Sequence, residues 1–238
     1  MKNRLENIFL LRHGDSEGNE DISKYREKPD ATINLIPRGK KRCEDAGAWF
    51  KNYINAGNVK IEPGMIRMWH SPYARTKESC YEFLKGFGMP GFFRDVREDI
   101  LLTEQQFGAF DGLTDDECAA AFPEEWQKHK LSQEYSVRLY SRPPNGESRF
   151  DVCLRTRQFF GTIIRDAEKE ENNMPNVFIS SHGTTIRAFT MMWLHLSTEW
   201  FEKEPNPKNA SIRHIGRDRN GRWKDYGYIY DGRAGGGR

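Results

Sequence analysis

Two junctions along the sequence share one pattern, in which a largely apolar run ends in a histidine that is followed by a glycine. The run 8–11 leads into Arg12 and His13, and the run 177–181 leads into His182. An arginine is a permanent cation, whereas an imidazole changes its charge near neutral pH. These residue types suit a reaction on an anion, and phosphate is the first candidate.

Both junctions fit the ends of buried strands, because short apolar runs bounded by polar residues are typical of a parallel sheet. A third such run, 65–70, precedes Arg75. Open α/β sheets bind ligands beyond the carboxyl ends of their strands, so we expect these side chains to meet at one edge. A phosphoryl group needs several donors, which two guanidinium groups, an imidazole and the amide of Asn19 can supply. Taken alone, Arg75 could be a surface cation and Asn19 a loop cap.

The composition favours one enzyme domain with a polar surface. Of the 238 residues, 37% are hydrophobic, which is enough for a packed core, and 30% are charged. The 37 basic and 35 acidic side chains give a net charge of +2. That balance disfavours nucleic acid and anionic membranes as partners, so any attraction for anions is local.

The apolar stretches, the cysteines and the histidines bear on the cellular compartment and on metal binding. No apolar stretch approaches the roughly 20 residues that a membrane helix needs, and the N-terminus has no signal-peptide pattern. The four cysteines are scattered without a CxxC pair, so we expect free thiols and a cytoplasmic protein. The six histidines are dispersed without an HExxH pattern, which disfavours a zinc hydrolase.

Strands and helices alternate along the chain. Strands are expected at 8–11, 65–70, 92–96 and 177–181, with a hairpin formed by 212–215 and 223–230. Helices are expected at 37–56, 71–84, 148–170 and 184–196, with short ones after Thr114 and from Pro123. Loops are expected at 15–36 and 98–113. This alternation predicts an α/β fold with a mainly parallel central sheet.

The chain has four short motifs: Leu11-Arg12-His13-Gly14, Ser71-Pro72-x-x-Arg75-Thr76, Leu102-x-Glu104-x-x-Phe107-Gly108 and Ser181-His182-Gly183. In this order they resemble the motifs of the histidine phosphatase superfamily, the phosphoglycerate mutase-like group. The resemblance implies a three-layer α/β/α domain over residues 1–230, with a specificity insert at about 113–146. We expect the Gly-rich residues 231–238 to form a disordered tail.

The resemblance also implies a phosphohistidine mechanism that uses no metal and no cofactor. By position, His13 attacks phosphorus as a neutral imidazole. Glu104 protonates the leaving alcohol and then activates water; outside the resemblance, a solvated loop carboxylate is its plainer role. Arg12, Arg75 and His182 act in catalysis through positive charge on the phosphoryl oxygens. The implied substrate-binding residues are Arg12, Asn19, Arg75, His182 and Thr184.

Departures from the mutase pattern favour a phosphatase. Mutases of the group typically carry Arg-His-Tyr-Gly where this chain has Gln-Gln-Phe-Gly at 105–108, and a tryptophan where it has Gly18. Their paired arginines are missing between 112 and 144, where Arg138 and Arg142 stand apart. The segments that resemble broad-specificity phosphatases are Lys28-Pro29-Asp30 and Gly146-Glu147-Ser148 with Asp151 and Arg155.

We therefore expect a metal-independent phosphomonoesterase that hydrolyses small phosphate esters. Two alternatives stay open: a 2,3-bisphosphoglycerate-dependent phosphoglycerate mutase, and a non-catalytic module that binds phosphorylated ligands. The basic residues near 213–222 fit a solvated hairpin face better than a nucleic-acid site. The physiological substrate and the oligomeric state are not determined by the sequence.

Overall fold

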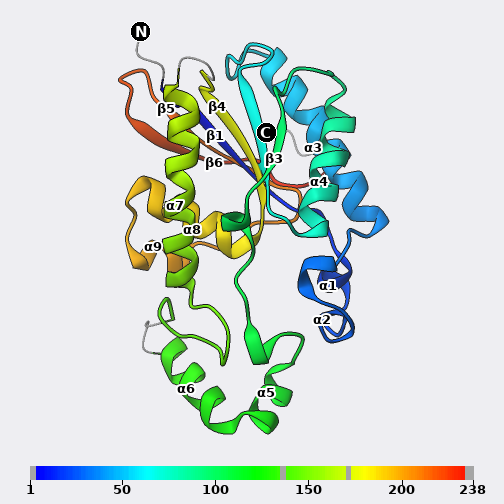
Figure 1. Cartoon of the computed structure of the whole chain (residues 1–238), viewed down its shortest axis with the longest axis vertical. Coiled ribbons are helices and arrows are strands. Elements are labelled where there is room, and N and C mark those ends of the chain that lie inside the picture. Colours follow the sequence, from blue (N-terminus) through cyan, green and yellow to red (C-terminus); the bar gives the residue numbers. More distant parts are fainter. Residues whose placement is uncertain (1–3, 135–137, 170–172, 234–238) are drawn as a thin grey trace.

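Strands of one central sheet lie between two layers of helices (Figure 1). The computed structural model describes residues 4–134, 138–169 and 173–233. The strands in these ranges are β1 (Asn7–Arg12), β2 (Ile66–His70), β3 (Val96–Glu98), β4 (Asn176–Ser181), β5 (Ile212–Arg217) and β6 (Trp223–Tyr230). Their order in the sheet is β3-β2-β4-β1-β5-β6. The predicted α/β/α architecture is confirmed.

The sheet is parallel on one side of β1 and antiparallel on the other. β1 pairs in parallel with β4, β4 with β2, and β2 with β3. β5 pairs with β1 in the antiparallel sense, and β6 returns along β5 as the predicted hairpin. The sheet is therefore mainly parallel, as predicted, with the hairpin added at one edge.

The register of the three central parallel strands determines where their ends lie. Arg12 pairs with Ser181 across β1 and β4, and Ser180 pairs with His70 across β4 and β2. These strands therefore end at the same level. The residues that follow them, His13 among them, lie side by side at the carboxyl edge of the sheet.

The helices follow the predicted pattern, with shorter helices at the carboxyl edge. They are α1 (Glu17–Glu20), α2 (Lys24–Glu27), α3 (Pro37–Asn55), α4 (Ala74–Phe87), α5 (Asp115–Ala121), α6 (Pro123–Glu134), α7 (Arg149–Glu168), α8 (Gly183–Leu194) and α9 (Thr198–Lys203). Single 3-10 turns occur at Asp30–Thr32, Ile100–Leu102 and Gly108–Phe110.

Alternate residues of β1 face the two helical layers, as expected for a strand that is buried on both faces. Phe9 and Leu11 pack in the cluster that contains α3 and α4. Ile8 and Leu10 pack in the cluster that contains α7 and α8. In the part of the chain that the structure describes, no helix is both long and apolar enough to span a membrane.

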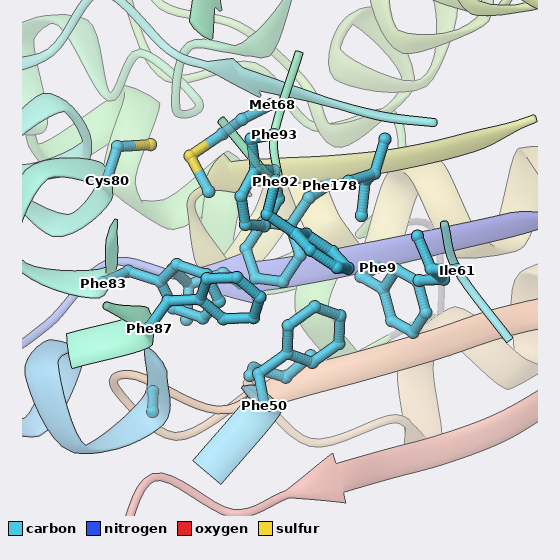
Figure 2. Close-up of a cluster of buried hydrophobic side chains, with 14 of the residues drawn as sticks. Phe9, Phe50, Ile61, Met68, Cys80, Phe83, Phe87, Phe92, Phe93 and Phe178 are labelled. Atoms are coloured by element: carbon cyan, nitrogen blue, oxygen red, sulfur yellow. The ribbon is translucent and has the colours of Figure 1, made fainter. Parts of the chain in front are cut away.

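Aromatic rings fill the layer between the sheet and the helices α3 and α4 (Figure 2). Phe50 of α3 stands edge-on to Phe9 and Phe178, with ring centroids 4.9 and 5.2 Å apart. Phe83 and Phe87 of α4 complete this fully buried set. Each buried phenylalanine contributes roughly 1.5–3 kcal/mol. The cluster thereby fixes α4 on the sheet, and with it the first turn of that helix at the carboxyl edge.

The helices α5 and α6 lie beyond the carboxyl edge, in the segment predicted as an insert (Figure 1). Thr114 caps α5 as predicted, because it exchanges hydrogen bonds with Glu117. Ser148 caps α7 by the same reciprocal pattern with Asp151. Residues 135–137 lie outside the described ranges, and the role of the segment in specificity stays a prediction.

Several predicted boundaries are wrong. The expected loop 15–36 contains α1 and α2, two four-residue helices that are too short for an apolar repeat; Ser16 and Asn19 form a capping box at the start of α1. The helix expected from residue 71 begins at Ala74, because the residue before it, Tyr73, keeps an extended backbone (φ −69°, ψ 139°). The strand expected at 92–96 is β3, which begins only at Val96.

The shift of β3 has a packing cause, since Phe92 and Phe93 turn into the aromatic core instead of extending the strand. The helix α9 was not predicted; its short length leaves little periodicity, although Ser197 caps it. All four cysteines are buried and free, as predicted. Of the predicted disordered tail, residues 234–238 lie outside the described ranges.

Candidate active site

A cavity of about 390 Å³ opens at the carboxyl edge of the sheet, with residues of α5 and α6 in its outer wall. The predicted site residues that line it are Arg12, His13, Asn19, Arg75, Glu104 and Thr184. His182 adjoins His13, with the two ring centroids 5.3 Å apart. The structure therefore brings all the predicted site residues together.

His13 is 4% exposed, and its ring is oriented by the backbone carbonyl of the next residue. Its Nδ1 atom lies 2.7 Å from the carbonyl oxygen of Gly14. A carbonyl can only accept a hydrogen bond, so Nδ1 carries the proton and Nε2 keeps its lone pair. Burial, reinforced by the charges of Arg75 and Arg12, lowers the pKa of His13 well below its usual value. The ring is therefore neutral at pH 7 and has a nucleophilic nitrogen.

His182 is fully buried, between His13 and Tyr73. Its Nε2 atom lies 2.9 Å from the hydroxyl of Ser71, which can donate to it and so leave the ring proton on Nδ1. That Nδ1 atom is buried and has no partner among the described residues. Burial, and then the charge of Arg75, lowers the pKa of His182 well below its usual value. His182 is therefore neutral in the free protein, rather than the predicted cation.

Arg12 and Arg75 are the cations that act on His13. Arg12 donates through Nη1 to the carbonyl of Pro207. Arg75 donates through Nη1 to the carbonyl and Oδ1 of Asp30, at 2.8 and 2.6 Å. In both arginines, Nε is buried without a partner in the described part of the chain. A buried donor without an acceptor is costly, so this arrangement suits an anionic ligand.

Two carboxylates near Arg75 were not predicted as site residues. Asp30 forms a close ion pair with it, and Asp111 lines the same cavity. Burial, together with the charge of Asp30, raises the pKa of Asp111 to about 6. An anionic ligand that reaches Arg75 therefore competes with a carboxylate of the protein itself.

Glu104 is held at the cavity by hydrogen bonds from three groups. Its Oε1 accepts from the amide of Gln105 at 2.9 Å and from the hydroxyl of Thr185 at 3.3 Å. Its Oε2 accepts from the amide of Thr184 at 3.3 Å. Thr184 and Thr185 belong to the first turn of α8, where backbone amides favour a negative charge. Arg155 also donates to the Glu104 carbonyl, at 3.0 Å, and so ties the loop to α7.

Asn19 faces the cavity from an exposed position. Its side-chain oxygen accepts from the amide of Ser16 at 3.2 Å and from Asn209 at 3.0 Å. Its side-chain NH2 group is therefore the part that can donate to a ligand. Asn209, which was not predicted, also donates to the carbonyls of His13 and Gly14, both at 3.1 Å. It thus connects His13 to the Asn19 loop.

Tyr25 lines the cavity next to the glycine that departs from the mutase pattern. A Cβ atom at Gly18 would lie 2.3–2.5 Å from the Tyr25 ring and hydroxyl. Only glycine leaves room for the phenol in this position, so any side chain at residue 18 would displace it.

The outer wall combines aromatic and basic side chains that no local pattern placed there. They are Phe107, Phe110, Trp126, His129, Arg138 and Arg149. The His129 ring stacks on Trp126 with centroids 5.4 Å apart, and Phe110 meets Trp126 edge-on at 5.5 Å. Arg138 and Arg149 therefore both line the cavity, whereas Arg142, the other arginine of the predicted insert, is exposed and pairs with Asp151. Within the described ranges, no cluster of His, Cys, Asp or Glu is arranged to hold a metal ion.

Comparison with known proteins identifies the family of the chain. The family model for the histidine phosphatase superfamily (branch 1) matches residues 8–226. The phosphoglycerate mutase-like protein AT74 of Arabidopsis thaliana is 33% identical over 211 residues, which are 87% of this chain but only 63% of that protein. The chain thus spans less than two thirds of this relative.

Two further proteins resemble the chain over most of both lengths. The 2,3-bisphosphoglycerate-dependent phosphoglycerate mutase of Nitrobacter hamburgensis is 30% identical, over 89% of this chain and 91% of the mutase. The solved structure of the mycobacterial glucosyl-3-phosphoglycerate phosphatase with VO3 has a TM-score of 0.68 at 21% identity, covering 94% of this chain and 99% of that one. The likeness in structure shows a shared fold. Because the family model covers nearly all of the chain, the chain belongs to the histidine phosphatase superfamily.

Proposed function

We propose that the chain is a metal-independent phosphomonoesterase that hydrolyses small phosphate esters through a phosphohistidine at His13. One observation carries the proposal. His13 is neutral and has its lone pair on Nε2, while the buried Nε–H groups of Arg12 and Arg75 and the buried Nδ1 atom of His182 lack partners among the described residues. A phosphoryl group bound at His13 would supply acceptors for those donors.

The first step transfers the phosphoryl group to the protein. The Nε2 lone pair of His13 forms a bond to phosphorus as the ester P–O bond breaks, and the electron pair of that bond goes to the alcohol oxygen. Glu104 in its protonated form gives this oxygen a proton, so a neutral alcohol leaves. Arg12 and Arg75 stabilise the charge on the phosphoryl oxygens.

The second step returns the protein to its starting state. The carboxylate of Glu104 takes a proton from water, and the water oxygen bonds to phosphorus as the P–N bond breaks. The electron pair of that bond returns to Nε2 of His13, and inorganic phosphate leaves. Glu104 is again protonated, so one residue serves as acid and then as base.

A phosphoglycerate mutase is the second candidate, because relatives of the chain carry that name. Hydrolysis is favoured by the packing of Tyr25 over Gly18, where the mutase pattern has a tryptophan. The two activities separate in one assay, in which phosphate release and the interconversion of phosphoglycerates are measured together. Interconversion that outpaces phosphate release identifies a mutase.

The decisive variant is His13→Ala. We expect phosphate release to fall by about 10⁴-fold or more, because the nucleophile is lost. Acid quenching should trap an acid-labile phosphoenzyme in the wild type but not in the variant, and EDTA should leave the rate unchanged. His195→Asn is the matched control, since His195 is exposed on the far end of α8 and its φ of 53° suits asparagine. Turnover by His13→Ala close to the wild-type rate would contradict the proposal.

A further inference from the structure

The loop that carries Glu104 is held in place by side chains of other elements. Four consecutive carbonyl groups, from Leu101 to Glu104, each accept a hydrogen bond from a side chain. Arg155 of α7 donates to the first through Nη1 at 2.9 Å and to the last through Nη2 at 3.0 Å. The two between them accept from the hydroxyl groups of Ser181, at 2.8 Å, and Thr185, at 2.6 Å. One planar guanidinium therefore holds both ends of this segment.

Arg155 is itself held by Glu147, which lies just before the cap of α7. Arg155 donates through Nε to Oε1 of Glu147 at 3.0 Å and through Nη2 to Oε2 at 3.2 Å. Glu147 also contacts the residues that follow Glu104. Its Oε2 accepts from the amide of Gln106 at 3.1 Å, and its carbonyl accepts from the side chain of Gln105 at 2.8 Å. The ion pair thus fixes the loop on both sides of Glu104.

The ion pair lies behind the cavity wall. The side chains of Arg155 and Glu147 are only 13% and 23% exposed, and neither is among the described residues that line the cavity. Glu104 does line it. A shift of about 1 Å in a reacting group can lower a rate by about 100-fold. An effect of the pair on the reaction would therefore act through the position of Glu104.

A second ion pair at the same end of α7 provides a comparison. Arg142 donates through Nε to Asp151 at 2.6 Å, and also through Nη2. The Arg142 side chain is 63% exposed, and its partner Asp151 belongs to the helix cap. Both pairs join one guanidinium to one carboxylate near the start of α7, but the hydrogen bonds to the Glu104 loop come from Arg155 and Glu147.

We propose that Arg155 and Glu147 are positioning residues for the acid and base roles of Glu104. They hold the loop so that the carboxyl group reaches the leaving oxygen in the first step and water in the second. The proposal rests on the proposed function, because it takes Glu104 as the proton donor and acceptor. The binding of the phosphoryl group by Arg12 and Arg75 does not depend on this ion pair.

Two esters that differ in their need for a proton test the proposal. The p-nitrophenolate of p-nitrophenyl phosphate leaves as a stable anion, whereas the alcohol of n-butyl phosphate must be protonated as it leaves. We expect Arg155→Met and Glu147→Gln to lower kcat/KM for n-butyl phosphate by about 10- to 100-fold. For p-nitrophenyl phosphate the same parameter should fall by less than about threefold, because kcat/KM stops at phosphoryl transfer to His13.

The second step gives an independent measurement. Because Glu104 also activates water, its displacement should slow the hydrolysis of the phosphohistidine. With p-nitrophenyl phosphate, both variants should therefore show lower kcat and lower KM together, and acid quenching should trap more phosphoenzyme than in the wild type. A general loss of structure would instead lower kcat/KM for both esters equally and would not accumulate phosphoenzyme.

Three further variants complete the test. Arg142→Met is the matched control and should keep the wild-type rates with both esters. Glu104→Gln is the reference and should show the same pattern at larger size. Arg155→Lys keeps the charge but reaches fewer of the acceptors, so it should show the pattern at smaller size; it decides the matter if Arg155→Met does not fold.

The results separate the two proposals. Equal losses with both esters, or no loss, in the variants of Arg155 and Glu147 overturn the positioning role alone, provided that Glu104→Gln shows the pattern. If Glu104→Gln does not distinguish the esters, or if the wild type releases phosphate from neither, the proposed function is wrong and the positioning role is wrong with it.

Discussion

Arg67 and Arg213 are buried arginines outside the cavity lining, and each is held by two carboxylates. Arg67 pairs with Asp95 and Asp166, and Arg213 with Glu204 and Asp225. The arginines that line the cavity differ. Among the described residues, Arg12 and Arg149 form no ion pair, and Arg75 pairs only with Asp30.

The difference separates arginines whose charge is balanced by two carboxylates from arginines whose buried donors lack a partner among the described residues. A guanidinium between two carboxylates has its charge and its donors satisfied inside the protein. The cavity arginines keep buried donors unsatisfied, at a cost in stability that a bound anion would offset. Loss of the first kind should therefore lower stability, and loss of the second kind should lower activity.

The sharpest test on the structural side is Arg67→Ala. We expect it to lower the free energy of unfolding by about 3–5 kcal/mol, because Asp95 and Asp166 are left without their shared partner. Urea denaturation measures this loss. Arg222→Ala is the control, since the Arg222 side chain is 76% exposed and its pairing with Asp218 should contribute little. Equal stability of the two variants would break the comparison.

Arg12→Gln tests the arginines that line the cavity. We expect kcat to fall by about 100- to 1,000-fold, the usual loss when a donor to transition-state charge is removed. The denaturation midpoint should stay close to the wild type, because Arg12 has no ion-pair partner among the described residues. A loss of stability as large as that of Arg67→Ala would place Arg12 with the structural arginines.

Asp30→Asn tests the intermediate case, Arg75. Removal of the carboxylate charge frees the guanidinium for a ligand, so we expect the inhibition constant of inorganic phosphate to fall by about tenfold. Asp21→Asn, in an exposed turn of the same segment, is the control. Weaker phosphate binding in Asp30→Asn would show instead that Asp30 holds Arg75 in its binding orientation.

The smallest expected effect belongs to Asp111→Asn and depends on pH. The pKa of Asp111 is raised to about 6 in the folded protein, above the value of 3.8 for a free side chain. Its charge therefore destabilises the folded state increasingly as pH rises from about 4 to 6, and fully above that range. Relative to the wild type, Asp111→Asn should be more stable at pH 7 by on the order of 1 kcal/mol, after allowance for solvent screening. Unfolding temperatures at pH 4 and pH 7 measure this, and an equal difference at both would contradict it.

The parts of the site that follow strand ends could be predicted from the sequence. His13 and His182 end apolar runs, and the parallel register of β1 and β4 makes such ends neighbours. The same local reasoning yields α3, because Pro37 opens it and its apolar residues recur at helical spacing. Signals of this kind lie within one short segment of chain.

The positions of three charged residues that line the cavity, Asp30, Asp111 and Arg149, could not be predicted in the same way. Asp30 and Asp111 reach Arg75 only through the folding of two long loops. Arg149 lies one residue past a helix cap, where sequence alone gives it a solvated position. The segment between Gly112 and Pro144 has few apolar repeats, so no pattern indicates which of its side chains turn inward.

The proton on His13 is fixed by the peptide carbonyl of the next residue, not by a partner side chain. The acceptor belongs to the backbone, and glycine is required at this position because a Cβ atom at Gly14 would lie only 2.5 Å from the Gly39 carbonyl oxygen. The tautomer with its lone pair on Nε2 is thus set by the path of the backbone, with no side-chain acceptor at Nδ1. Substitutions in the outer wall can therefore change the lining of the cavity without removing the hydrogen bond that sets this tautomer.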